Sequence, residues 1–397
     1  MNKIERMLQE LCPEGVEYKK LGEVLDYEQP TKYLVKDTCY DDSYQTPVLT
    51  AGQSFILGYT NEQNGIYEAS KDNPTIIFDD FTCSFHWVDF SFKVKSSAMK
   101  MLRPINGKEI SFKYVYYAMS CIGFIPVDHA RHWISKYSLF EIPVPPLLIQ
   151  EEIVRILDHF TELTASLQAE LQARQEQYEY YRNRLLTFAK IGGGTQSVTW
   201  VKMSELFDIR NGYTPSKANA AYWENGAIPW FRMEDIRQNG RILLDSIQHI
   251  TPAAVKGGRL FPANSFIIAT TATIGEHALI IVDSLANQRF TNLQVRKSLM
   301  EKVDIKYLYY YMFIVGEWCR NNINVSGFAS VDMKKFKKLL IPIPQLSEQQ
   351  RIVSILDKFE TFVNGLSQGL PAEIAAVQEQ YEYYRNKLLT FNRIQSN

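Results

Sequence analysis

The chain has 397 residues, of which 46% are hydrophobic and 22% charged, with a formal net charge of -1. This balance excludes a disordered or fibrous protein, and the length predicts two to four domains. The near-neutral charge excludes a globally basic nucleic-acid binder, so attraction for nucleic acid must come from local patches or from a second protein.

The first residues, "MNKIERMLQELCPEG", carry acidic side chains where a secretory signal peptide would have a small-residue cleavage site. No stretch approaches the eighteen or so uninterrupted apolar residues that a membrane span needs. We therefore expect a cytoplasmic protein. The five cysteines are scattered and lack a C-x-x-C spacing, which argues against a disulfide framework or a structural zinc site.

Residues 1–145 contain short runs typical of strands, such as "TPVLTAG" (46–52) and "PTIIFDDF" (74–81), followed by "KYVYYAM" (113–119), which predicts a short helix. The second run ends in Asp79 and Asp80. Neighbours on a strand point to opposite faces, so these carboxylates cannot act together on one atom and are interpreted as hydrogen-bonding or solvated groups.

A histidine pair follows near residue 130. His129 and His132 are spaced so that they could ligate a metal, but no third ligand is spaced nearby. Arg131, between them, is the better candidate for a nucleic-acid contact.

A long amphipathic helix is predicted over 146–190. After the proline-rich "EIPVPP", apolar residues recur mostly at steps of three and four, which gives about forty residues and roughly 60 Å of helix. Within "TASLQAEL" (164–171), successive steps of four at Leu163, Leu167 and Leu171 form a stutter in the heptad. The stretch "IGGGTQS" (191–197) is interpreted as a flexible link.

The second half repeats this plan. Residues 198–344 hold strand-like runs at 265–275 and 292–297, a short predicted helix at 306–312, and 18 Lys and Arg against 12 Asp and Glu between 198 and 340. A second helical segment is predicted over 345–393, with a break or kink at "NGLSQGLP" (364–371) because it contains two glycines and a proline.

The two helical segments are copies of each other. "QEQYEYYRNRLLTF" (175–188) returns as "QEQYEYYRNKLLTF" (378–391), and both copies begin with I-P-x-P, a Gln and I-V-x-I-L-D. A helix with an apolar stripe needs a partner, and the other copy is the obvious one, in an antiparallel pair with a pseudo-twofold axis. The alternative is that each helix packs on its own domain. The expected seam and partner-docking residues are Ile153, Ile156, Leu167, Leu171, Tyr178, Tyr181, Leu185, Phe188, Ile352, Ile355, Ile374, Val377, Tyr381, Tyr384, Leu388 and Phe391.

Signatures of catalysis are missing. The sequence lacks G-x-S-x-G, H-E-x-x-H, the phosphate loop, the dinucleotide-binding glycine pattern and the Asn/Asp-Pro-Pro-aromatic motif of adenine methyltransferases. We therefore expect no catalytic residues and no bound metal in this chain.

With two variable domains, each followed by I-P-x-P, a Gln, I-V-x-I-L-D and the tyrosine-rich repeat, the chain resembles the specificity (S) subunits of type I restriction-modification enzymes over its full length. The resemblance implies an α+β fold with two target recognition domains joined by an antiparallel coiled coil. It also implies that each domain reads half of a bipartite, asymmetric site in double-stranded DNA. Two methyltransferase (M) subunits would bring S-adenosylmethionine, and restriction (R) subunits would bring ATP and magnesium.

Readout of bases and contacts to phosphates need basic, amide and hydroxyl side chains. Candidates lie in turns marked by Gly or Pro. In the first domain they are Thr31, Lys32, Lys36, Thr50, Gly52, Gln53, Lys95, Lys100, Arg131 and His132; in the second they are Thr214, Ser216, Lys217, Arg232, Arg237, Thr271 and Arg289.

Two other functions stay open at this point. The chain could be a self-contained methyltransferase or nuclease with an unfamiliar motif, which methylation by the purified chain alone would support. It could also be a scaffold whose helices join two domains unrelated to DNA, which the absence of a methyltransferase partner would support.

Overall fold

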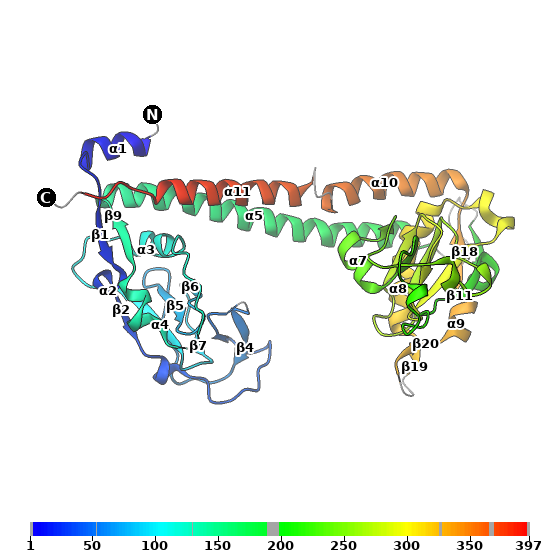
Figure 1. Ribbon diagram of the computed structural model, residues 1–397, viewed down its shortest axis with the longest axis horizontal. Coiled ribbons are helices and arrows are strands. Elements are labelled where there is room, and N and C mark those ends of the chain that lie inside the picture. The colour runs from blue at the N-terminus through cyan, green and yellow to red at the C-terminus, as the bar shows by residue number, and fades with distance from the viewer. Residues whose placement is uncertain are drawn as a thin grey trace. The chain divides into compact units, whose positions relative to one another are not determined.

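A computed structural model describes residues 3–52, 54–128, 130–188, 198–324, 328–364 and 369–394. The chain forms two compact units, one of Met1–Gln168 with Glu373–Asn397 and the other of Ala169–Ala372. Figure 1 shows that the first unit combines the blue and cyan part of the chain with its red C-terminal helix. The predicted link at 191–197 lies outside the described residues.

The first unit contains an antiparallel four-stranded sheet and a three-stranded sheet. The four-stranded order is β2 (Leu25–Glu28), β8 (Met99–Pro104), β5 (Thr75–Asp79) and β6 (Phe85–Val88). The three-stranded order is β4 (Ile56–Thr60), β3 (Thr46–Leu49) and β7 (Lys93–Val94), with β3 and β7 parallel. A separate pair joins β1 (Glu17–Lys20) to β9 (Glu141–Val144). The strands predicted within 46–52 and 74–81 are confirmed.

The second unit repeats this strand order. Its larger sheet is β11 (Phe207–Asn211), β18 (Phe290–Val295), β15 (Ser265–Ala269), β16 (His277–Ile280) and the added edge strand β13 (Ile242–Leu243). Its smaller sheet is β14 (His249–Ile250), β12 (Ile228–Phe231) and β17 (Leu285–Ala286), and β10 (Thr199–Lys202) pairs with β21 (Leu340–Ile343). A short hairpin joins β19 (Ile323–Asn324) to β20 (Ser330–Val331). Two domains with weak sequence similarity therefore share one topology, and the predicted α+β class is confirmed.

The shorter helices cover the sheets and connect the strands. They are α1 (Lys3–Leu11), α2 (Leu21–Val24), α3 (Phe112–Met119), α4 (His132–Ser135), α6 (Met203–Leu206), α7 (Met233–Asn239), α8 (Ile305–Asn321) and α9 (Met333–Lys338). Both predicted tyrosine-rich helices are confirmed as α3 and α8. The second is longer than expected because its apolar run continues beyond Met312 and stays buried. Its start is capped by Asp304, whose carboxylate accepts from the backbone N–H of Lys306 and Tyr307.

The long helices match the sequence prediction in length, and most of the predicted break at 364–371 lies outside the described residues. Helix α5 (Leu147–Leu186) has 40 residues, and the second copy is divided into α10 (Leu346–Asn364) and α11 (Leu370–Leu388). The glutamine that both copies share, Gln150 in α5 and Gln349 in α10, connects the start of each helix to the preceding domain. Gln150 Nε2 donates to Pro145 O (2.7 Å), and its Oε1 accepts from Ser111 N (2.9 Å). Gln349 repeats this with Pro344 O (2.8 Å) and Asp304 N (2.8 Å).

Within each unit the start of one helical copy meets the tail of the other. In the first unit, Phe160 stacks on Tyr384 at 5.6 Å, and Leu388 shares a core with Ile153. In the second unit, Tyr181 stacks on Phe359 at 5.9 Å, and Tyr178 shares a core with Ile352. Both cores also contain residues of a globular domain. The start of each helical copy therefore packs on the domain that precedes it and on the tail of the other copy. Pairing of the two copies and packing on the preceding domain, the two alternatives from the sequence, occur together.

Most of the expected seam residues are buried or partly buried. The fully buried members are Ile153, Leu167, Tyr178, Ile352, Ile374, Val377 and Leu388; the partly buried members are Ile156, Leu171, Leu185, Phe188, Ile355, Tyr381 and Phe391. Tyr181 and Tyr384 are the more exposed members, although each stacks on a phenylalanine. Leu157 and Leu356, which the sequence reading passed over, are both completely buried. None of the described helices is long and apolar enough to cross a membrane.

The segment at Val16 pairs with the segment 392–394 within the first unit. Val16 N donates to Asn392 O (2.8 Å), and Ile394 N donates to Val16 O (3.2 Å). Gly15 has a φ of +115°, and a Cβ added there would lie 2.8 Å from Asn392 O. Only glycine fits this conformation and this approach.

Gly15→Ala should therefore destabilise the first unit. We expect a cost of about 1–3 kcal/mol, because the new methyl group meets backbone atoms and the φ is strained for an L residue. Thermal unfolding of the purified chain measures this. Gly107→Ala is the matched control, since Gly107 has φ +79° but no atom within 4 Å of an added Cβ. Equal melting temperatures for the two variants would contradict the steric part of the explanation.

Candidate nucleic-acid interface

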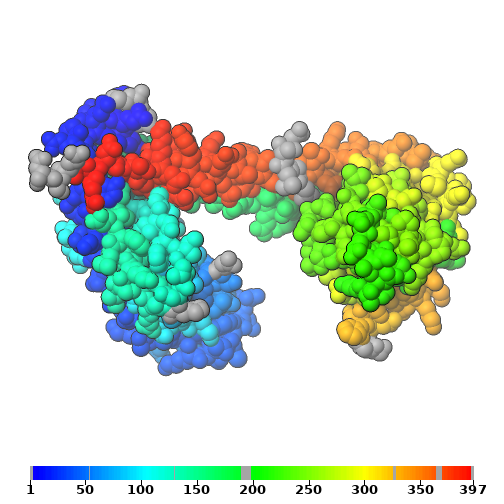
Figure 2. All heavy atoms as spheres, viewed as in Figure 1, coloured from blue at the N-terminus to red at the C-terminus, as the bar shows by residue number. Residues whose placement is uncertain are grey.

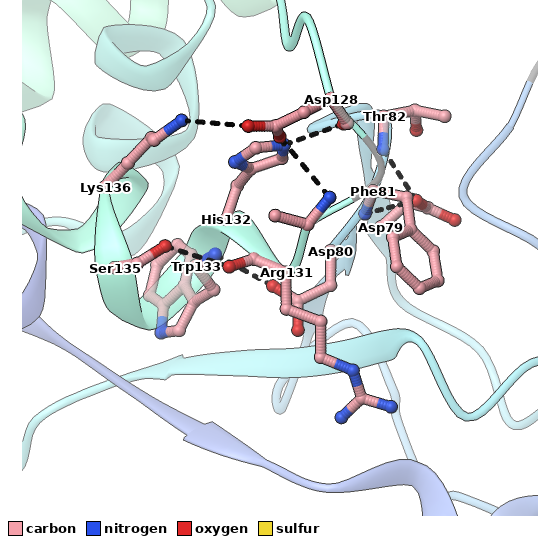
Figure 3. Close-up of polar contacts among 11 residues, drawn as sticks. Asp79, Asp80, Phe81, Thr82, Asp128, Arg131, His132, Trp133, Ser135 and Lys136 are labelled. Carbon is pink, nitrogen blue, oxygen red and sulfur yellow. Dashed lines mark hydrogen bonds and ion pairs between the residues drawn. The ribbon is translucent and has the colours of Figure 1, made fainter.

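In the first unit, two loops lie at one edge that we call the first rim, residues 79–84, 128 and 130–132. Asp79 Oδ1 accepts from the backbone N–H of Phe81 and Thr82, both at 2.9 Å, which closes the turn after β5. Asp80 O accepts from His132 N (2.9 Å), and Asp80 Oδ1 accepts from Trp133 N (2.8 Å). Figure 3 shows these contacts. The aspartates thus have the hydrogen-bonding role predicted for them.

Arg131 occupies the surface of the first rim. It precedes α4, and its side chain is exposed. In Figure 3 its guanidinium extends away from the Asp80 contacts, with no contact drawn to the other residues shown. This candidate is available to a partner.

Two other candidates from the same region are wrong as surface contacts. Lys100 is 1% exposed, and its Nζ lies 3.1 Å from Asp80 Oδ2, so it neutralises a buried carboxylate. His132 is completely buried, with Nε2 3.2 Å from Asp128 Oδ1. Neither residue can reach DNA because the fold turns its side chain inward. His129 and Gln53 lie outside the described residues, and within the described part no group of three His, Cys, Asp or Glu side chains could hold a metal ion.

The loop after β3 joins the first rim. Ser84 Oγ donates to Ala51 O, and the His86 ring contacts Gly52 O at 3.2 Å. Thr50 Oγ1 accepts from Gly52 N (3.2 Å). The structure therefore brings Thr50 and Gly52 together with the turn after β5.

The remaining candidates of the first unit lie along β7. Val35 N donates to Val94 O (2.9 Å), which places the exposed Lys36 near the exposed Lys95. Thr31 and Lys32 lie exposed on the short 3-10 helix Pro30–Tyr33, where Lys32 pairs with Glu28 at 3.7 Å. These side chains can meet a phosphate, although Lys32 already has a carboxylate nearby.

The second unit has a corresponding edge, the second rim, formed by residues 212–217, 270–274, 287–290 and 328–331. Thr270 N donates to Arg289 O (2.9 Å), and Gly212 N donates to Phe290 O (2.9 Å). Val331 N donates to Thr270 O (2.9 Å), as His132 N does to Asp80 O in the first unit. The predicted residues Thr214, Thr271 and Arg289 are thus brought together.

The other candidates of the second unit are more spread. Ser216 and Lys217 are exposed in the turn whose Ser216 O accepts from Trp223 Nε1 (3.0 Å). Arg237 is exposed on α7, whereas Arg232 is half-buried, with its guanidinium 5.8 Å from the centre of the Trp230 ring.

Sequence reasoning missed one exposed aromatic side chain on each rim and one amide side chain on the second. Phe81 is exposed on the first, and Phe328 is 99% exposed on the second. Gln288, also exposed, is hydrogen-bonded to Thr214. The sequence held no clear signal for them, because single hydrophobic residues are common on protein surfaces.

The duplicated helix tails expose matching faces. Tyr180 is 60% exposed and Tyr383 is 59% exposed, and each is followed by a basic residue at the same offset, Arg184 or Lys387. Arg184 lies 3.5 Å from Tyr180 OH, and Lys387 Nζ lies 5.8 Å from the Tyr383 ring centre. The repeat therefore presents the same surface twice.

Two domains of one topology, each with a polar rim and a shared helical surface, define a protein built for two-part recognition. A family model described as type I restriction modification DNA specificity domain matches residues 13–174 and 197–376. The chain belongs to this type I restriction-modification specificity family.

Relatives match over the whole chain or one half. The EcoR124I/EcoR124II specificity subunit of Escherichia coli is 46% identical over 394 residues, covering 95% of this chain and 94% of the relative. The EcoprrI specificity subunit of Escherichia coli is 55% identical over 201 residues, covering 49% of this chain and 50% of the relative.

Solved structures share the fold. A chain from a study of complex assembly and conformational transition of the type I R-M system has a TM-score of 0.59 at 17% identity, covering 94% of this chain and 97% of that one. The S subunit from M. genitalium has a TM-score of 0.51 at 13% identity, covering 94% and 96%.

Proposed function

We propose that this chain is the DNA specificity subunit of a type I restriction-modification enzyme, and that each recognition domain reads one half of a bipartite, asymmetric DNA site. The observation that carries the proposal is the repeated strand order, in a chain that matches a specificity subunit over 95% of its length. The two rims differ in their side chains. Different side chains on one scaffold suit two different half-sites.

The duplicated tail surface supports two identical docking sites. One chain with two copies of the same exposed tyrosine and basic residue can hold two copies of one partner. We assign these sites to two methyltransferase subunits. In this proposal S-adenosylmethionine is bound by the methyltransferase, and ATP and magnesium by restriction subunits, so the present chain contributes recognition and not catalysis.

The test is the methylation pattern of DNA from cells that contain this chain and its methyltransferase subunit. We expect methylated adenine in two short DNA sequences, which we call words, separated by a constant number of base pairs, the gap. Arg131→Ala should relax only the word read by the first domain, and Arg289→Ala only the other, because each side chain lies on one rim; a base contact is worth about 1–3 kcal/mol.

Arg155→Ala serves as a control, since this exposed arginine lies on α5 and pairs with Glu152 at 2.7 Å. It should leave both words unchanged. Methylation by the purified chain alone would instead favour a self-contained enzyme, and purification without any methyltransferase partner would favour the scaffold alternative.

A further inference from the structure

A cluster of arginines lines a cleft within the second unit. The tail of α5, the loop before β16 and the C-terminal part of α8 enclose about 530 Å³. We call it the arginine cleft and define it by Arg182, Arg241, His277, Phe313 and Arg320. The guanidinium carbons of Arg182 and Arg241 lie 4.2 Å and 5.3 Å from the centre of the Phe313 ring. Two cations are therefore held against one aromatic side chain.

The loop before β16 rests directly on α8. A Cβ added to Gly275 would lie 2.3 Å from Gly316 O and 2.9 Å from Arg320 Nη1. Arg241 Nη1 donates to His277 O (3.1 Å), and its Nη2 pairs with Glu276 at 2.7 Å. Backbone contacts between the loop and α8, and the hydrogen bond from Arg241 to His277 O, therefore form part of the cleft.

Three arginines and three glutamates line the cleft, but the buried Arg182 has no ion-pair partner among the described residues. Arg182 is 8% exposed, its Nε lies 3.4 Å from Asn183 Oδ1, and among the described residues its guanidinium forms no ion pair. Glu276 offsets Arg241, whereas Glu179 and Glu317 line the cleft with exposed side chains, one helical turn before Arg182 and Arg320. A buried cation without a counter-charge is costly, so an anion entering the cleft would be stabilised.

His277 lines the cleft with an uncharged polar side chain. Burial, and then the nearby Arg241, lower the pKa of His277 to about 3, so the ring is uncharged at neutral pH. Its Nδ1 lies 3.2 Å from Gly275 O and carries the proton, which leaves Nε2 buried without a hydrogen-bond partner among the described residues. Nε2 is an acceptor, which a water molecule would satisfy.

The cleft continues from the second rim along one loop. Thr271 lies on the rim, and Thr273, four residues before His277, lines a neighbouring hollow with Arg237, Arg241 and Arg320. The basic side chains therefore extend from the second rim toward the tail of α5. DNA offers phosphates next to the bases that a domain reads, so a single duplex can contact the rim and the cleft together.

The first unit supplies a natural comparison. Arg385 is the repeat counterpart of Arg182, lies 5.6 Å from the Tyr381 ring centre as Arg182 lies 5.3 Å from Tyr178, and reaches Asn386 at the same 3.4 Å. In the first domain the side chain of Arg385 interacts with Cys121. Arg182 therefore lies in a cluster with two other arginines, Arg241 and Arg320, whereas its counterpart Arg385 contacts a cysteine.

We propose that the arginine cleft binds a backbone phosphate of the DNA and so fixes the register of the second recognition domain without reading sequence. This inference rests on the proposed function. It adds Arg182, Arg241 and Arg320, none of which was a candidate from the sequence, as phosphate contacts.

The experiment measures DNA affinity against salt concentration for the complex of this chain with its methyltransferase subunits. Arg182→Gln and Arg320→Gln should each weaken binding several-fold at low salt and reduce the salt slope by about 1, equally for cognate and unrelated duplexes. Arg385→Gln, the matched control, should leave the slope unchanged. Glu179→Gln should tighten binding, because it removes a negative charge at the mouth of the cleft.

A second measurement locates the phosphate. Duplexes with single methylphosphonate replacements should show one position that weakens the parent complex but not the Arg320→Gln complex. Because Arg320 is exposed, this variant is expected to fold, and gel filtration checks that both variants still assemble. Unchanged salt slopes in both arginine variants, or failure of Arg182→Gln to assemble with the methyltransferase, would overturn the proposal. Methylation of two words by the same variants would leave the proposed function standing.

Discussion

Lys100→Ala is expected to destabilise the first unit by about 3–5 kcal/mol, because it leaves the carboxylate of Asp80 buried and unpaired. Asp80 is 1% exposed and lies 3.1 Å from Lys100. The same carboxylate accepts a hydrogen bond from Trp133 N at the start of α4. The loss of stability should therefore also affect the first rim, which carries Arg131. Denaturant unfolding of the purified chain, followed by tryptophan fluorescence, measures the change.

Two further variants separate this explanation from a DNA contact. Lys95→Ala removes an exposed lysine of the same domain and should change the free energy of unfolding by less than about 0.5 kcal/mol. The double variant Asp80→Asn with Lys100→Met should recover much of the stability, since no charge is left unpaired. If Lys100→Ala unfolds like the parent chain while binding DNA more weakly, the buried-pair interpretation is wrong.

Repeating the tetrad Gln168–Leu171 once in α5 should lengthen the gap between the two methylated words. Four helical residues add about 6 Å, close to two base-pair steps, and overshoot one turn by about 40°, so the apolar stripe stays nearly in register. The second copy already carries four more residues than the first between its Gln and its tyrosine repeat. We expect both words to remain the same.

Sequencing of methylated adenines in cells that express the insertion variant gives the result directly. The same four residues inserted in the exposed turn at Lys71 and Asp72 should leave the gap unchanged, since that turn lies outside the helices. An unchanged gap in the α5 variant would show that the helix length does not set the spacing.

Local patterns explain why much of the fold was predictable. The apolar period predicted the 40-residue length of α5, whereas most of the break predicted from the glycines and Pro371 lies outside the described residues. The strands of both domains followed from β-branched and aromatic runs. The candidate site was less accessible, because a lysine in a sequence can neutralise a buried carboxylate, as Lys100 does, or remain in solvent, as Lys95 does.

The sequence by itself determined that this protein is a duplicated two-part chain with two globular domains and two long helical segments, since repeats and helical periodicity are properties of neighbouring residues. Only the tertiary structure decided which half of each helix meets which tail, that His132 and Lys100 are buried, and that Arg182 joins Arg241 and Arg320 in one cleft. These features depend on contacts between residues far apart in the chain, and no local pattern specifies them.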